Sequence, residues 1–181
     1  AATLGGGVDI LVNNAGIAIG GPVTEYSLAD WRKQQAVNVD GVFLGVKHSL
    51  PLMRKSGGGS IINMSSVAGM KGSANMSGYC ATKGAVRLFT KSIAMECAAA
   101  GDGVRVNSVH PGIIDTPFFD HASFDTFPSR ARARAIAPDR VAAAIVRAVR
   151  RGSAEVTIPA SYVIGTVLKT AAPGFFSRLM R

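Results

Sequence analysis

The chain has 181 residues, of which 48% are hydrophobic and 17% are charged. That composition excludes an intrinsically disordered protein, and the length predicts a single domain over residues 1–181 with an ordinary hydrophobic core. No apolar run reaches the roughly 18 residues of a membrane-spanning helix, so no transmembrane segment is predicted.

The first third of the chain predicts a buried strand and two helical stretches. The apolar run Val8–Val12 is typical of a strand covered on both faces, as in a parallel sheet, and it ends at the amide and small residues Asn13–Gly16. Ser27 is a typical N-cap for a helix that begins near Leu28. A second helical stretch follows Asn38, because apolar residues then recur at the spacing of one helix face.

The middle of the chain repeats this alternation. Ser60–Met64 predicts a second buried strand, which ends at Ser65–Ser66. A long helix over residues 78–100 follows and ends at a glycine. Val104–Val109 predicts a third strand, which is followed by Pro111–Gly112.

The last third begins with a segment rich in aromatic residues and arginines. Residues 113–137 are expected to form a mobile, partly helical flap. Pro138 is well placed as the first residue of a helix. Glu155–Ile158 predicts a short fourth strand, a helix ending near Ala171 follows, and residues 173–181 form a basic tail.

Strands and helices thus alternate along the whole chain, which predicts an α/β fold with a parallel sheet and right-handed crossovers. In such sheets, ligands bind at the carboxyl ends of the strands. Asn13–Gly16, Ser65–Ser66 and Pro111–Gly112 all follow predicted strands. We therefore expect these three segments to meet at one edge of the sheet and to form a binding site there.

A serine, a tyrosine and a lysine near this edge have the chemistry of an acid–base site. Tyr79 and Lys83 are four residues apart, so they share one face of the predicted helix. A lysine cation close to a phenol lowers the phenol pKa from its ordinary value of about 10 toward neutral pH. Ser66 would orient a substrate oxygen. A simple helix-surface pair is the alternative interpretation of Tyr79 and Lys83.

Several short motifs resemble one known family, the short-chain dehydrogenase/reductases. The matching residues are NNAG at Asn13–Gly16, Asn38, Ser66, YCATK at Tyr79–Lys83, RVNSVHPG at Arg105–Gly112, and Thr116. The match covers about residues 8–117 and looks most like secondary-alcohol and hydroxysteroid dehydrogenases. It implies a Rossmann-like doubly wound parallel sheet. It also implies an NAD(P)-dependent oxidoreductase that interconverts a secondary alcohol and a ketone.

The resemblance implies a role for each matching residue. Tyr79 would be the general acid/base, and Lys83 would lower its pKa and hold the nicotinamide ribose. Ser66 would bind the substrate oxygen, and Asn38 would hold a water that continues the proton relay. The adenosine side of the cofactor would be lined by Asn13, Ala15 and Gly16. Its nicotinamide end would be lined by Pro111, Gly112, Ile114 and Thr116.

The flap contains a cluster of aromatic residues that suits a small apolar alcohol or ketone. Its members are Phe118, Phe119, Phe124 and Phe127. Packing of these rings within the flap itself is an equally good interpretation.

The chain departs from the family at its beginning. Family members start with a strand and a TGxxxGxG turn that binds the cofactor pyrophosphate, and this chain has no such motif. The lacking β-α-β-α-β half corresponds to on the order of 60–75 residues. We therefore expect a truncated sequence in which Val8–Val12 forms a hydrophobic sheet edge. The residue that selects NAD or NADP would lie in this lacking half, so the sequence does not indicate which of the two cofactors is used. The alternative function is a catalytically inactive fragment that acts only as an oligomer subunit or binding partner.

The remaining expectations concern compartment, metals and assembly. Cys80 and Cys97 lie far apart on one predicted helix without metal-ligand spacing. We expect no metal site, and buried free thiols in a cytoplasmic protein. Members of the family pack the helices corresponding to residues 39–55 and 78–100 against a second subunit, so a homodimer or homotetramer is expected.

The formal net charge of +9 comes mostly from residues 130–181, which carry ten basic and two acidic side chains. Nucleic-acid binding is one interpretation of such a surplus. No basic strand interleaved with aromatic residues accompanies it, so a solvated arginine-rich helix face is expected and a nucleic-acid partner is not. Apolar residues also alternate with arginines in the tail, which allows a peripheral contact with a membrane surface.

Overall fold

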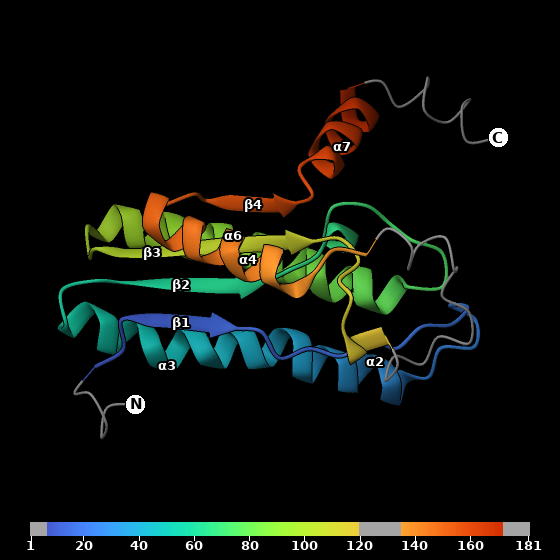
Figure 1. The fold of residues 1–181 in the computed structure, drawn as a ribbon. Helices are drawn as coiled ribbons and strands as arrows, with labels where there is room; N and C mark the ends of the chain where they lie inside the picture. The colour runs from blue at the N-terminus through green and yellow to red at the C-terminus, as the bar shows by residue number, and fades with distance from the viewer. Residues whose placement is uncertain (1–6, 120–134, 172–181) are drawn as a thin grey trace.

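The computed structural model describes residues 7–119 and 135–171, apart from the side chains of residue 119 and of residues 165, 166 and 168–170. Four parallel strands form one sheet in the order β1-β2-β3-β4 (Figure 1). The strands are β1 (Ile10–Asn13), β2 (Gly59–Met64), β3 (Val104–Pro111) and β4 (Glu155–Ile158). The predicted parallel α/β sheet is therefore confirmed. Most of the predicted flap, with Phe124 and Phe127, and the basic tail lie outside the described residues.

Helices alternate with the strands as the sequence predicted. They are α2 (Leu28–Gln35), α3 (Gly41–Lys55), α4 (Ser77–Ala100), α6 (Pro138–Arg151) and α7 (Ser161–Ala171). The side chain of Ser27 caps α2 by accepting a hydrogen bond from the Asp30 amide, and Gly101 ends α4 in the left-handed conformation with φ 59°. Three short helical segments complete the described chain: the π-helix η1 (Ala36–Asp40) and the 3₁₀ helices η2 (Val67–Gly69) and η3 (Pro117–Phe119). None of the described helices is long and apolar enough to cross a membrane.

Neighbouring residues of β2 point to opposite faces of the sheet and build a separate core on each face. Ile61 packs with Val46 of α3 and Cys97 of α4, whereas Ile62 packs with Val141 of α6. Both isoleucines are completely buried. Helices therefore cover both faces of the central strands, which explains why these strands read as continuous apolar runs.

The third crossover differs from the other two. Strand order in the sheet follows the order along the chain, so every crossover moves in the same direction. Helices α3 and α4 pack on one face and α6 packs on the opposite face (Figure 1). The connection from β3 to β4 therefore has the opposite hand, and our expectation of right-handed crossovers throughout is wrong. On the α4 face, Arg87 and Lys91 already cover β4 through ion pairs with Glu155 at 2.8 and 3.3 Å.

Strand β1 is an edge of the described sheet and exposes apolar side chains. Ile10 is 55% exposed and Val12 is 43% exposed. The register pairs Val12 with Ile62, so these side chains lie on the face that α6 covers further along the sheet. The predicted hydrophobic edge is confirmed for the described residues.

The two cysteines are both free, as predicted, but only Cys97 is buried, whereas Cys80 is half-buried. Helices α3 and α4, which are expected to meet a second subunit, expose the large apolar residues Phe43, Leu44, Leu88 and Met95. The oligomer stays a prediction.

A row of polar side chains runs through the α4 side of the sheet. Asn13 Nδ2 donates to Asn63 Oδ1 at 2.8 Å, and Asn63 Nδ2 donates to Thr90 Oγ1 at 3.0 Å. The Asn13 amide also lies against Gly45 of α3, where an added Cβ would collide with Asn13 Oδ1 and lie 3.0 Å from its Cγ. Because Gly45 has no side chain, the Asn13 amide has room to form its hydrogen bond with Asn63.

We expect Gly45→Ala to lower the free energy of unfolding by about 1–3 kcal/mol, because the methyl group would push Asn13 away from Asn63. Urea denaturation monitored by circular dichroism measures this change. The matched control is Gly41→Ala on the same helix, where an added Cβ meets only Ala36 O at 3.8 Å. That change should be neutral or stabilising by up to about 1 kcal/mol. Equal effects of the two variants would contradict the packing argument.

Candidate active site

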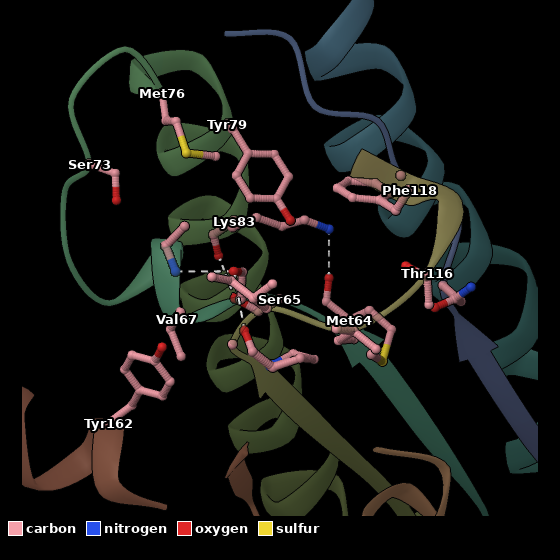
Figure 2. Close-up of a pocket in the computed structure, with 18 of the residues that line it drawn as sticks. Met64, Ser65, Val67, Ser73, Met76, Tyr79, Lys83, Thr116, Phe118 and Tyr162 are labelled. Atoms are coloured by element: carbon pink, nitrogen blue, oxygen red, sulfur yellow. Dashed lines mark hydrogen bonds between the residues drawn. The ribbon is translucent and has the colours of Figure 1, made fainter. Parts of the chain in front are cut away.

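Segments that follow three strands line one cavity of about 560 Å³ at the carboxyl edge of the sheet (Figure 2). Residues 14–16 come from the end of β1, residues 64–68 from the end of β2, and residues 111–114 from the end of β3. Tyr79 and Lys83 enter from α4. The sequence therefore predicted correctly that these segments meet at one edge.

Lys83 is buried, with 4% of its surface exposed, and both its side chain and its backbone are held by the segment after β2. Its Nζ donates to the backbone carbonyl of Met64 at 2.9 Å, and its own carbonyl accepts from Ser65 Oγ at 2.8 Å (Figure 2). Gly69 lies so close that an added Cβ would be 2.5 Å from Lys83 O. Burial lowers the pKa of Lys83 to about 8, so the ammonium is the main form at neutral pH.

Tyr79 is buried beside Lys83, whose Nζ lies 5.6 Å from the centroid of the phenol ring. Burial raises the pKa of Tyr79 to about 12, whereas the Ser66 hydroxyl acts in the opposite direction. The sequence led us to expect a lowered phenol pKa. In this structure the cost of burying the phenolate outweighs the neighbouring charge, since the Lys83 ammonium is directed at the Met64 carbonyl.

Ser66 lies at the beginning of η2 and faces the cavity. Its Oγ accepts a hydrogen bond from the amide of Ala68 at 3.1 Å and donates to the carbonyl of Pro111 at 3.4 Å. Only 8% of its surface is exposed. These two contacts fix the hydroxyl between the ends of β2 and β3, in the wall that also holds Tyr79.

Asn38 is fully buried within the π-helix η1, and it lies outside the cavity wall. Its Oδ1 accepts a hydrogen bond from the Ile17 amide at 2.8 Å, and its Nδ2 donates one to the Ile17 carbonyl at 2.8 Å. Nδ2 also donates to Thr82 Oγ1 at 3.0 Å. The side chain thereby joins the segment after β1 to helix α4, with both amide hydrogens donated and Oδ1 already accepting one bond.

The NNAG motif divides between packing and the cavity. The side chain of Asn13 is directed toward Asn63 and does not line the cavity, whereas Asn14, Ala15 and Gly16 do. An added Cβ at Gly16 would lie 3.3 Å from the Asn38 amide oxygen and 3.4 Å from Lys83 Nζ. The lack of a side chain at Gly16 thus keeps the space next to the lysine open.

Pro111, Gly112, Ile114 and Thr116 all line the cavity, and their contact with a cofactor stays a prediction. The Ile136 amide donates to Ile113 O at 2.9 Å, and the Asp115 amide donates to Ile136 O at 3.0 Å. These bonds hold the two described ends of the flap together. Phe118 also lines the cavity, with its ring centroid 6.2 Å from that of Tyr79 (Figure 2).

The sequence analysis missed a buried polar cluster that supports the start of α4. Gln34 Oε1 accepts from the Ile19 amide at 2.6 Å, and Gln34 Nε2 donates to the Tyr26 hydroxyl at 3.2 Å. Both side chains press on Gly78, where an added Cβ would lie 2.7 Å from Gln34 Nε2. Gly78 immediately precedes Tyr79, so this packing positions the tyrosine. A glutamine in an otherwise polar helix gives no local signal of such a role.

Three further wall residues were also missed: Lys71, Ser73 and Tyr162. They come from the loop before α4 and from the first turn of α7. No motif marked them, because the path of these segments follows from tertiary packing. Among the described residues, no group of three or more histidines, cysteines, aspartates and glutamates could hold a metal ion.

His110 lies on β3, next to Pro111 of the cavity wall, and is completely buried. Its Nε2 lies 2.8 Å from Ser108 Oγ and 3.6 Å from Glu155 Oε1. Burial lowers the pKa of His110 to about 4, and the hydrogen bond from Arg87 lowers the pKa of Glu155 to about 2. At neutral pH the cluster therefore contains a neutral imidazole beside a carboxylate.

A parallel sheet with helices on both faces, whose carboxyl edge gathers a buried serine, tyrosine and lysine in one cavity, is a Rossmann-like α/β fold with its site at the ligand-binding edge. A family model described as short chain dehydrogenase matches residues 1–125. The chain belongs to the short chain dehydrogenase family.

Relatives and solved structures agree with this assignment. The chain is 44% identical over 146 residues to a 3-alpha-(or 20-beta)-hydroxysteroid dehydrogenase of Mycobacterium tuberculosis, covering 81% of this chain and 55% of that protein. It is 48% identical over 116 residues to an NADP-dependent (R)-specific alcohol dehydrogenase of Lentilactobacillus kefiri, covering 64% of this chain and 46% of that protein. A short-chain dehydrogenase from Streptomyces avermitilis superimposes with a TM-score of 0.81 at 28% identity, over 99% of this chain and 74% of that one. The chain spans about half the length of the curated relatives it matches.

We expect the free energy of unfolding to fall by about 2–3 kcal/mol between pH 7 and pH 4.5 because of His110. Its pKa of about 4 in the folded state lies below the ordinary value of 6.5, so the unfolded chain binds the proton first as the pH falls. The stabilisation is complete above about pH 6.5 and is lost as the pH approaches 4. Urea denaturation across this range measures the slope.

His110→Gln should flatten the slope between pH 6.5 and 4.5, whereas His48→Gln at an exposed position should leave it unchanged. Glu155 has a pKa of about 2 in the folded state against an ordinary value of 4.5, so its stabilising contribution begins to be lost only at the acid end of this window, where it adds a smaller slope of the same sign. A His110→Gln variant that keeps the full slope would show that another group causes it.

Proposed function

We propose that the protein is an NAD(P)-dependent oxidoreductase that interconverts a secondary alcohol and a ketone, with Tyr79 as the general acid/base. The observation that carries the proposal is the burial of Ser66, Tyr79 and Lys83 in the wall of one cavity at the ligand edge of the sheet. The names of the relatives, which include a hydroxysteroid dehydrogenase and an alcohol dehydrogenase, support the same reaction class.

The residues near Lys83 fit the nicotinamide end of the cofactor. An ammonium has three donors, and of the described acceptors only the Met64 carbonyl engages Lys83 in a hydrogen bond, which leaves donors for two ribose hydroxyls. Gly16 keeps the adjoining space open, while Pro111 and Thr116 line the opposite wall. NAD or NADP bound along this edge would supply or accept the hydride, and the protein would orient it and handle the proton.

Tyr79 would exchange that proton with the substrate oxygen. With a pKa of about 12, the phenol is protonated at neutral pH and is ready to donate to a carbonyl oxygen. Ser66 would donate a hydrogen bond to the same oxygen, and the Lys83 charge would stabilise the phenolate that forms. The Asn38 side chain already donates both amide hydrogens and accepts one bond at Oδ1, so a relay water at that residue would bind its backbone carbonyl.

The substrate is proposed to be small and largely apolar. Around the acid–base group, the described wall is largely apolar and includes the side chains of Met64, Val67, Ala68, Met76 and Phe118. Apolar walls with a few polar groups are typical of sites that orient a ligand through one reacting oxygen.

Tyr79→Phe should lower kcat by about 10²–10⁴-fold, because the ring remains but the transferable proton is lost. Cofactor affinity should change little. Steady-state reduction of a ketone, followed by NAD(P)H absorbance, measures the rate. Ser92→Ala is the control, since it removes a hydroxyl from an exposed position of α4 outside the cavity wall, and its rate should stay within about threefold. An undiminished rate in Tyr79→Phe would remove this residue from the mechanism.

Fluorescence titration of the 181-residue chain with NADH and NADPH separates the enzyme from the non-catalytic alternative. The proposal predicts saturable binding that Lys83→Ala weakens at least about tenfold, through loss of charge-assisted hydrogen bonds. Lys55→Ala, at an exposed position on α3, should bind like the unchanged chain. Failure of the chain to bind either nucleotide would favour a role as an oligomer subunit or binding partner.

A further inference from the structure

The cavity has a second polar end that the acid–base group does not use. Lys71, Ser73 and Tyr162 form this end, and we call them the distal end of the cavity. Figure 2 shows Ser73 and Tyr162 on one side of Tyr79 and Lys83, with Thr116 and Phe118 on the other. Thr116, one of the proposed cofactor contacts, lies on the side away from Ser73 and Tyr162, so we expect the distal end to face the part of the cavity that a substrate would fill.

The charge of the described cavity wall is entirely positive. Its ionisable side chains include two lysines, Lys71 and Lys83, and no aspartate or glutamate. Lys83 is buried and bonded to the Met64 carbonyl. Lys71 is exposed and forms no ion pair with any residue that the structure describes. A cation is therefore available at the cavity mouth, with no described carboxylate in the wall to neutralise it.

The cation is held in place by its surroundings. Lys71 Nζ lies over the Tyr162 ring, 5.3 Å from its centroid, and the Lys71 amide donates to Val67 O at 3.2 Å. The Tyr162 ring in turn packs against Gly112, where an added Cβ would lie 2.8 Å from Tyr162 Cε2. At the far side of the loop, the Gly21 amide donates to Asn75 O at 2.8 Å. The lysine is thus part of a packed wall.

We propose that the substrate is a carboxylic acid, an oxo acid or the corresponding hydroxy acid, whose carboxylate binds at Lys71 and Ser73. This inference rests on the proposed function. A lysine and a serine hydroxyl suit one singly charged carboxylate, and the apolar wall between the two polar ends suits an aliphatic or cyclic spacer. In the reducing direction, the ketone carbon accepts the hydride from the reduced nicotinamide and its oxygen accepts the Tyr79 proton, while the carboxylate is unchanged.

The test compares ω-1 oxo acids of increasing length, such as 5-oxohexanoate and 7-oxooctanoate, with their methyl esters, which have the same ketone and no charge. We expect the best acid to exceed its ester at least about tenfold in kcat/KM at low ionic strength. Lys71→Gln should abolish this preference and leave ester kinetics within about twofold. Lys71→Glu should reverse it, and added salt should weaken it, since the site is exposed.

Lys55→Gln is the matched control and should keep the preference, because Lys55 is an exposed lysine outside the cavity wall. If ketones are reduced but Lys71→Gln does not change the acid-to-ester ratio, the inference is wrong while the proposed function stands. If no ketone is reduced, saturation-transfer NMR of 5-oxohexanoate still decides. Binding that Lys71→Gln abolishes supports the carboxylate site, and binding that it leaves unchanged, or no binding by the unchanged chain, overturns it.

Discussion

The site depends on the close approach of the segment after β2 to the backbone of α4 at Lys83. Met64 accepts a hydrogen bond from the lysine ammonium, Ser65 donates one to the lysine carbonyl, and Gly69 lies against the same peptide without a side chain. A buried charge is costly unless it is hydrogen-bonded, so this arrangement keeps the ammonium in a place where the solvent cannot reach it freely. The same contacts place Ser66 in the wall that contains Tyr79.

The parts of the fold that follow from local pattern were predictable. Apolar runs bounded by polar residues located all four strands, and Ser27, Gly101 and Pro138 marked helix ends through their backbone preferences. The meeting of the strand ends followed from parallel topology. The hand of the third crossover could not be predicted in this way, because it depends on which face of the sheet α4 already covers.

The site shows the same division between local and long-range information. A sequence motif names Asn13 and Asn14 together, but strand alternation sends them to different places. The register of β1 against β2 turns Asn13 toward Asn63, which leaves Asn14 for the cavity. The raised pKa of Tyr79 was equally out of reach, because it reflects burial by segments distant in sequence. Residues 71 and 162 lie far apart in the chain, and only the packed structure brings them together.

The π-helix at Ala36–Asp40 has a consequence for how this family member tolerates insertions and deletions. Four buried residues recur at every fourth position across it: Gln34, Asn38, Val42 and Val46. On a regular α-helix, such a row drifts around the axis by about 40° per step, and a wider turn takes up part of that drift. A π-helical turn contains about one residue more than an α-helical turn, so deleting one residue within this segment would restore regular geometry and leave the flanking residues in nearly their present orientation. The same deletion within regular α-helix would rotate the polar pair away from the apolar pair by about 100°, so this turn is the place in the row that can lose a residue, provided that Asn38 is kept.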